Sequence, residues 1–171
     1  MKAAVVIFPG SNRDVDVIDA LTAVSGKEPL LIWHRNTELP KADLIVLPGG
    51  FSYGDYLRCG AIAANSPICK ALAAHVERGG YALGICNGFQ ILLEAGLLPG
   101  AMQRNENLSF ICKNVPLRVE HRKSPLTALI PEEQTVLNIP IAHMEGNYTA
   151  DEEILNHLEE NGQILFRYSD A

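Results

Sequence analysis

The chain has 171 residues, of which 47% are hydrophobic, so it is long enough for one globular domain with a substantial core. Its formal net charge is -6 without a block of Lys or Arg, which argues against nucleic acid or an anionic membrane surface as a partner. No apolar run approaches the roughly 20 residues of a membrane span, and the N-terminus has no signal-peptide pattern, so we expect a cytoplasmic protein that acts on a small soluble molecule.

The chain begins with a strand and a helix. Residues 2–8 are apolar on both faces, as expected of a strand inside a parallel sheet. Ser11 or Asn12 can cap the helix that follows, which Gly26 ends. The expected core stripe of this helix consists of Val17, Ile18, Leu21 and Val24.

Strands and helices then alternate. Short apolar runs at residues 30–33 and 44–47 predict two more strands in interior positions of the sheet. A helix starts at Ser66-Pro67, and an apolar strand follows at residues 81–85. The alternation predicts an α/β fold with a doubly wound parallel sheet.

Gly49 and Gly50 follow the third strand at its carboxyl end, where open α/β sheets place their ligand sites. Because glycine has no side chain, backbone N–H groups are left uncovered there. The next segment, residues 51–60, is rich in glycine and aromatic residues and is too irregular for a helix. For Tyr53, Asp55 and Arg58, a packed surface loop and a functional role both remain open.

The segment around Cys86 reads G-x-C-x-G, between the strand at residues 81–85 and a helix expected at residues 89–98. This is the context of a nucleophile elbow, with Cys in the place of Ser. Glycines permit the sharp turn, and the N–H groups at the helix start favour an anion, which predicts a depressed thiol pKa of about 3.5 to 7.5. Cys86 is therefore a candidate thiolate nucleophile; the alternative is a small buried hydrophobic residue.

The other cysteines give no sign of a metal site. Cys59, Cys69, Cys86 and Cys112 form no C-x-x-C pair and no Cys/His spacing typical of zinc. We therefore expect reduced thiols and no metal.

The second half of the chain has a different pattern. Extended segments at residues 110–121 and 135–141 predict antiparallel additions to the sheet, followed by an amphipathic helix at 151–161 and a strand at 163–168. The polar cluster at residues 104–107 could line a site or form a solvated turn, and of the two the turn is favoured. His143 and Glu145 lie two apart at a strand end, so an extended chain would place this tempting acid/base pair on one face.

Five longer motifs are more specific than the elbow alone. They are FPGSN at 8–12, PGGFSYGDYLRCGAIA at 48–63, GICNGFQILLEAGLLPGAM at 84–102, RNENLSFIC at 104–112 and PIAHMEGNY at 140–148. Together they resemble the family of glutamine amidotransferase subunits of phosphoribosylformylglycinamidine synthase. The resemblance implies a single domain over residues 1–171, with the class I (triad) fold: a flavodoxin-like, doubly wound, mostly parallel sheet with helices on both faces.

The resemblance also implies roles for individual residues. Cys86 would attack the carboxamide carbon of L-glutamine and form a glutamyl thioester. The backbone N–H groups of Gly50 and Asn87 would form the oxyanion hole, which agrees with what the glycines suggest by themselves. Gly49 would allow the turn, and Gln90, one helical turn after the nucleophile, would face the bound glutamine.

The family implies partners as well. Ammonia from glutamine would pass to a synthetase subunit, which uses ATP to convert formylglycinamide ribonucleotide to the amidine in purine synthesis. We expect ATP and magnesium on the synthetase, no cofactor in this subunit, and a small accessory subunit in the complex.

One departure from the family concerns the base. In the family a His in a Pro-His-Pro-Glu segment takes the thiol proton, and no such segment occurs in these 171 residues, which suggests a C-terminally truncated chain. Without that base we expect Cys86 to react with a glutamine-like electrophile, but these residues alone to be inactive in steady hydrolysis. His143 and Glu145 are poor replacements, because the family carries this histidine in addition to its catalytic one. Two alternatives remain open: a noncatalytic partner-binding domain of the same fold, and a stand-alone cysteine hydrolase.

Overall fold

The structure is a computed structural model that describes residues 1–170. It consists of two compact units, the first comprising Met1–Ala101 and the second the described residues from Met102 onward. Each unit is described by itself. Whether both belong to one domain, as expected from the sequence, stays a prediction.

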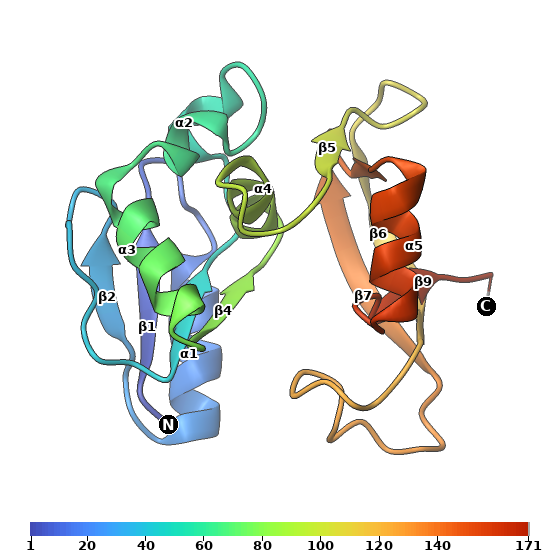
Figure 1. The fold of residues 1–171 in the computed structure, drawn as a ribbon, viewed down its shortest axis with the longest axis horizontal. Helices are drawn as coiled ribbons and strands as arrows, with labels where there is room; N and C mark the ends of the chain where they lie inside the picture. Colours follow the sequence, from blue (N-terminus) through green and yellow to red (C-terminus); the bar gives the residue numbers. More distant parts are fainter. Residues whose placement is uncertain (171) are drawn as a thin grey trace. The chain divides into compact units, whose positions relative to one another are not determined.

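The first unit is a parallel sheet with helices (Figure 1). Its strands are hydrogen-bonded in the order β2-β1-β3-β4, and each neighbouring pair is parallel. Its elements are β1 (Ala3–Ile7), α1 (Asp14–Ser25), β2 (Leu30–Trp33), β3 (Leu44–Leu47), the 3-10 helix η1 (Ser52–Asp55), α2 (Ala61–Ala64), α3 (Pro67–Glu77), β4 (Tyr81–Gly84) and α4 (Asn87–Glu94).

The core of this unit lies on both faces of the sheet. Successive strand residues point to opposite faces, so Val5 packs with Val17 of α1, whereas Val6 belongs to a cluster that includes Ile68 of α3 and Ile91 of α4. Helices therefore cover both faces, and the predicted doubly wound arrangement is confirmed.

The interior position predicted for β2 is wrong. Among residues 1–170 this strand pairs only with β1, and Leu30, Leu31 and Trp33 are exposed. An apolar run is typical of a buried strand, but which strand ends at the edge depends on pairing with distant segments.

The start of α1 also differs from the prediction. Arg13 occupies the N-cap position and makes no side-chain capping bond. The hydroxyl of Ser11 accepts a hydrogen bond from the Phe8 backbone N–H at 3.1 Å instead, so Ser11 stabilises the loop after β1. Val24, expected in the core stripe, is exposed, whereas Val17 is buried.

The second unit is mainly antiparallel, as predicted for this part of the chain. Its larger sheet has the order β7-β6-β9, and β5 pairs with β8. Its elements are β5 (Ala101–Gln103), which begins at the last residue of the first unit, β6 (Ile111–Val119), β7 (Val136–His143), β8 (Asn147–Thr149), α5 (Glu152–Glu160) and β9 (Phe166–Tyr168). Asp151 caps α5 by accepting a hydrogen bond from Ile154 N–H at 2.9 Å.

Within residues 1–170, each helix is too short or too polar to cross a lipid bilayer.

Candidate active site

Three loops meet at one edge of the parallel sheet. Strands β1, β3 and β4 run in the same direction, and β3 pairs with the other two, so the loops that follow them emerge at the same edge. These loops carry the motifs at residues 8–12, 48–50 and 84–88. This is where open α/β sheets bind ligands.

Cys86 lies on the sharp turn between β4 and α4. Its backbone is in an unfavourable region for a residue with a side chain, with φ 53° and ψ -110°, and it is the N-cap of α4. Its carbonyl accepts hydrogen bonds from Phe89 N–H at 3.0 Å and Gln90 N–H at 3.2 Å. The strand, turn and helix context predicted for a nucleophile elbow is confirmed, although the helix runs over Asn87–Glu94 rather than 89–98.

The second glycine of the elbow is required for packing. A Cβ atom on Gly88 would collide with the backbone carbonyl of Leu47 in β3. The first turn of α4 can therefore approach β3 this closely only with glycine at position 88.

The Gly49-Gly50 turn is fixed by the loop after β1. The Gly49 carbonyl accepts hydrogen bonds from Asn12 N–H at 3.3 Å and Arg13 N–H at 3.2 Å. Gly50 has φ +155°, and a Cβ atom there would lie 2.6 Å from the Gly10 oxygen. The turn therefore needs glycine both for its backbone conformation and for this close approach.

Two backbone donors reach the sulfur of Cys86. The N–H groups of Asn87 and Gly50 both form hydrogen bonds with it. Gly49 lies alongside, since a Cβ atom on it would be 3.4 Å from the Cβ of Cys86. The structure thus brings Cys86, Gly49, Gly50 and Asn87 together, and donors directed at a nucleophile can also stabilise the oxyanion that its attack creates.

The depressed thiol pKa expected from the helix terminus is wrong. Cys86 has exposed surface, yet the protein packed around its sulfur removes water, and this desolvation raises the pKa of the thiol above its ordinary value. The carboxylate of Asp55 also raises it, while the N–H groups of Asn87 and Gly50 lower it. Desolvation outweighs the two donors, so the thiol is protonated near neutral pH.

The raised pKa of the Cys86 thiol predicts that its alkylation depends steeply on pH. Only the thiolate reacts, so the rate of carbamidomethylation of Cys86 by iodoacetamide should rise about tenfold per pH unit from pH 7 to 9. Peptide mass spectrometry resolves Cys86 from the other three cysteines. A rate that has already reached a plateau at pH 7 would contradict a raised pKa.

The side chain of Asn87 joins the elbow to the loop after Gly50. It is buried, and its Oδ1 accepts a hydrogen bond from Ser52 N–H at 3.1 Å. Its Nδ2 donates to Asp55 Oδ1 at 3.3 Å and to Gln90 Oε1 at 3.0 Å. Gln90 is therefore buried beside Asn87, and its expected contact with glutamine stays a prediction.

A second buried network anchors the same loop, and sequence reasoning missed it. His34, at the end of β2, is 4% exposed. Its Nδ1 lies 2.9 Å from the Tyr53 hydroxyl and 3.2 Å from the Ser66 hydroxyl. Burial, followed by the Arg35 charge, lowers the pKa of His34, so the ring is neutral. The only signal in the sequence is a histidine ending an apolar strand, which does not identify its partners.

In the second unit, the polar cluster at residues 104–107 contains a buried residue, Asn105, that forms several hydrogen bonds. Asn105 Nδ2 donates to the carbonyls of Ser109 at 2.8 Å and His143 at 2.9 Å. Its Oδ1 accepts from Gly146 N–H at 3.0 Å and faces His143 Nδ1 at 2.9 Å, so Nδ1 carries the proton. For Asn105, the expectation of a solvated turn is wrong.

His143 and Glu145 do not share a strand face. Strand β7 ends at His143 and the chain bends at Met144, so the alternation expected of an extended chain does not reach Glu145. Burial lowers the pKa of His143 and favours its neutral form.

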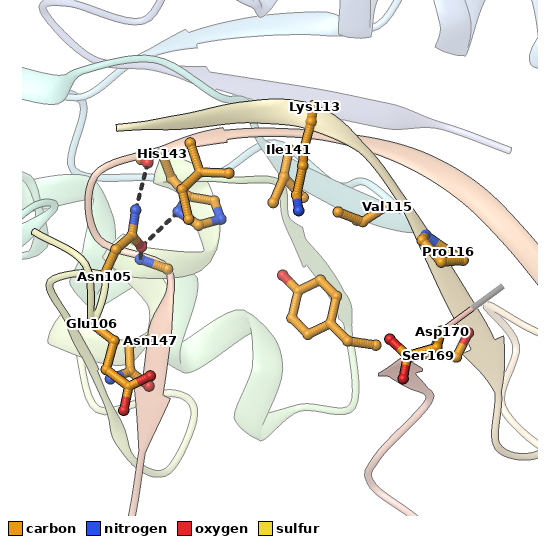
Figure 2. Close-up of a pocket in the computed structure, with 13 residues that line it drawn as sticks. Asn105, Glu106, Lys113, Val115, Pro116, Ile141, His143, Asn147, Ser169 and Asp170 are labelled. Carbon is orange, nitrogen blue, oxygen red and sulfur yellow. Dashed lines mark hydrogen bonds between the residues drawn. The ribbon is translucent and has the colours of Figure 1, made fainter. Parts of the chain in front are cut away.

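A cavity of about 650 Å³ lies in the second unit (Figure 2). His143 and Ser169 line it, and His143 Nε2 and Ser169 Oγ are buried without a hydrogen-bond partner among residues 1–170. Lys113 and Glu106 add charged groups. No cysteine appears among the described lining residues, so the candidate nucleophile belongs to the elbow and not to this cavity.

Comparison with known proteins gives the class of the chain. Residues 1–171 match the family described as the CobB/CobQ-like glutamine amidotransferase domain. The thiol elbow and its two backbone donors fit this class, because an amidotransferase of this kind needs a nucleophile and an oxyanion hole.

Individual relatives narrow the class. The chain is 55% identical to the phosphoribosylformylglycinamidine synthase subunit PurQ of Bradyrhizobium diazoefficiens, covering 100% of this chain and 73% of the relative. It is 56% identical to the PurQ subunit of a Synechococcus species, covering 99% of this chain and 75% of the relative. A chain in the structure of PurLQS from Thermotoga maritima is 43% identical with a TM-score of 0.85, over 99% of this chain and 75% of that one. The chain therefore belongs to the PurQ family of glutamine amidotransferase subunits.

Proposed function

We propose that the chain is a glutaminase subunit that hydrolyses L-glutamine to glutamate and supplies ammonia to the synthetase subunit of phosphoribosylformylglycinamidine synthase. The synthetase uses this ammonia and ATP to convert formylglycinamide ribonucleotide to formylglycinamidine ribonucleotide in de novo purine biosynthesis. The observation that carries the proposal is the contact of two backbone N–H groups, from Gly50 and Asn87, with the sulfur of Cys86. Membership of the PurQ family supports it.

The chemistry follows from this arrangement. The Cys86 sulfur attacks the carboxamide carbon of glutamine, and the carbonyl oxygen becomes an oxyanion that accepts hydrogen bonds from Gly50 N–H and Asn87 N–H. The C–N bond then breaks, and the nitrogen takes the proton that the thiol gave up. Ammonia departs, and a glutamyl thioester remains on Cys86. Water hydrolyses the thioester to glutamate and regenerates the thiol.

The thiol needs a base, because its pKa is raised by desolvation. Both histidines of the first unit have other contacts: His34 with Tyr53 and Ser66, and His75 with the carbonyl of Tyr81. We propose that the base comes from outside the first unit. Turnover by the elbow then depends on how a base is brought to Cys86.

In the proposed complex the ATP-dependent step takes place on the synthetase subunit. The subunit itself uses no cofactor, while ATP and magnesium bind the synthetase, and a small accessory subunit completes the assembly. The similarity to a chain of PurLQS from Thermotoga maritima supports an assembly of this kind. The complex acts in the cytoplasm.

A glutamine-like electrophile tests the proposal directly. The reagent 6-diazo-5-oxo-L-norleucine should modify Cys86 in preference to the other exposed thiol, Cys112. L-Glutamine should protect Cys86, whereas D-glutamine and L-asparagine should not. The measurement is peptide mass spectrometry of the labelled chain, and equal labelling of both cysteines without protection by glutamine would reject the proposed function.

A further inference from the structure

The loop after Gly50 holds three successive residues in the left-handed backbone region. Tyr53 has φ 54°, Gly54 has φ 72° and Asp55 has φ 54°. Glycine adopts this region readily and aspartate with some cost, whereas a bulky residue such as tyrosine adopts it rarely. Such a run persists only where the surrounding structure fixes it.

Contacts on both sides fix this run. Tyr53 N–H donates to the Pro9 carbonyl at 2.7 Å, and its hydroxyl lies 2.9 Å from His34 Nδ1. On the other side, Asn87 Nδ2 donates to Asp55 Oδ1 at 3.3 Å. Asn87 is 2% exposed and directly follows Cys86, so the half-buried Asp55 carboxylate is tied to the elbow.

A carboxylate in this position disfavours the thiolate form of Cys86. The Asp55 charge interacts with Cys86 and raises the pKa of its thiol, adding to the larger effect of desolvation. Attack requires the sulfur to become anionic, and a nearby negative charge opposes that change. The fold nevertheless fixes the carboxylate there, through a buried amide and an unfavourable backbone conformation.

We propose that Asp55 binds the α-ammonium group of the glutamine substrate, and this inference rests on the proposed function. In glutamine, four bonds separate the carboxamide carbon from the ammonium nitrogen, a span of about 5 Å when extended. In the proposed binding mode one molecule presents its carboxamide to Cys86 and its cation to Asp55, which interacts electrostatically with Cys86 and is hydrogen-bonded to the adjacent residue Asn87. The bound cation offsets the negative charge, so substrate binding lowers the thiol pKa at the moment when the thiolate is needed.

The substitution Asp55→Asn separates this role from a structural one. Asn keeps the shape and the oxygen that accepts the bond from Asn87, but it loses the charge. Labelling of Cys86 by 6-diazo-5-oxo-L-norleucine should slow about 10- to 100-fold, the usual effect of losing a hydrogen bond to a charged group. Alkylation of Cys86 by iodoacetamide, which has no ammonium group, should become faster at pH 7 because the opposing charge is gone.

Protection experiments address the ammonium group itself. With the unsubstituted chain, L-glutamine should protect Cys86 from iodoacetamide far better than glutaramate, the analogue that lacks the α-amino group. In Asp55→Asn this preference should shrink about 10-fold or more. Asp55→Glu keeps the charge and should retain part of the preference. Asp19→Asn, the same change at an exposed position of α1, should alter none of these results.

The outcomes are distinguishable. If both reagents react more slowly with Asp55→Asn, or if its preference for glutamine over glutaramate is unchanged, Asp55 does not bind the ammonium group and the inference is wrong, while the proposed function stands. If glutamine fails to protect Cys86 in the unsubstituted chain, the proposed function fails and this inference fails with it. A thermal unfolding measurement on each variant checks that it is folded.

Discussion

Replacing Cys86 with alanine should reduce the glutaminase rate by about four to six orders of magnitude, which is the usual effect of removing a nucleophile that forms a covalent intermediate. Without the sulfur no thioester can form, and the two backbone donors at Gly50 and Asn87 have no tetrahedral intermediate to stabilise. The measurement is glutamate released from L-glutamine by the chain in complex with its synthetase partner, with intact-mass detection of the glutamyl adduct.

The matched control for this substitution is Cys112→Ala. Cys112 is also exposed, but it lies in β6 of the second unit, so its removal should leave the rate unchanged. If Cys86→Ala retained more than about a hundredth of the activity, the elbow would not carry the nucleophile. In that case a noncatalytic partner-binding domain would become the better description of the first unit.

The second large effect is expected for Gly50→Ala. The added Cβ atom would lie 2.6 Å from the Gly10 oxygen and 2.8 Å from the Ser11 Cα, so the backbone must shift. That shift moves the Gly50 N–H away from the Cys86 sulfur and should lower the glutaminase rate about 10²- to 10³-fold, as the loss of one oxyanion donor does. Alkylation of Cys86 by iodoacetamide, which forms no oxyanion, should change far less.

Gly26→Ala provides the control for backbone strain. Gly26 ends α1 with φ +70°, and a Cβ atom there would have no neighbour within 4 Å. The variant should lose some stability, about 1 kcal/mol, without any change in the glutaminase rate. If both glycine variants lost activity in parallel with their unfolding temperatures, a general loss of folding would explain Gly50→Ala.

Much of the fold could be predicted because its signals are local. The apolar runs at Leu30–Trp33 and Leu44–Leu47 are the strands β2 and β3 over the same residues, and the amphipathic pattern near the C-terminus is α5. The edge position of β2 could not be predicted. It depends on the order of the strands, in which β1 pairs with β3 on one side and β2 on the other. Strand order is a property of contacts between distant segments.

In the candidate site, too, features set by neighbouring residues could be predicted and features set by distant residues could not. Cys86 and the glycines of its elbow were found because a sharp turn imposes a short, readable pattern on the sequence. The direction of the thiol pKa was predicted wrongly, since the helix terminus is visible in the sequence whereas desolvation of the sulfur depends on what packs around it. The contacts of Asn87 with Ser52, of His34 with Ser66 and of Asn105 with His143 join residues more than 30 positions apart, and no spacing rule indicates them.

The connection between the loops after β1 and β3 has a consequence for the energetics of catalysis. The N–H groups of Asn12 and Arg13 donate to the Gly49 carbonyl, and Phe51 N–H donates to the Gly10 carbonyl. These bonds orient the peptide group between Gly49 and Gly50 before any substrate arrives. In water, solvent dipoles must reorient around a developing oxyanion, and that reorganisation contributes to the barrier. In this protein the Gly50 dipole is aligned when the chain folds, so under the proposed function the reaction would proceed in surroundings already polarised for its transition state.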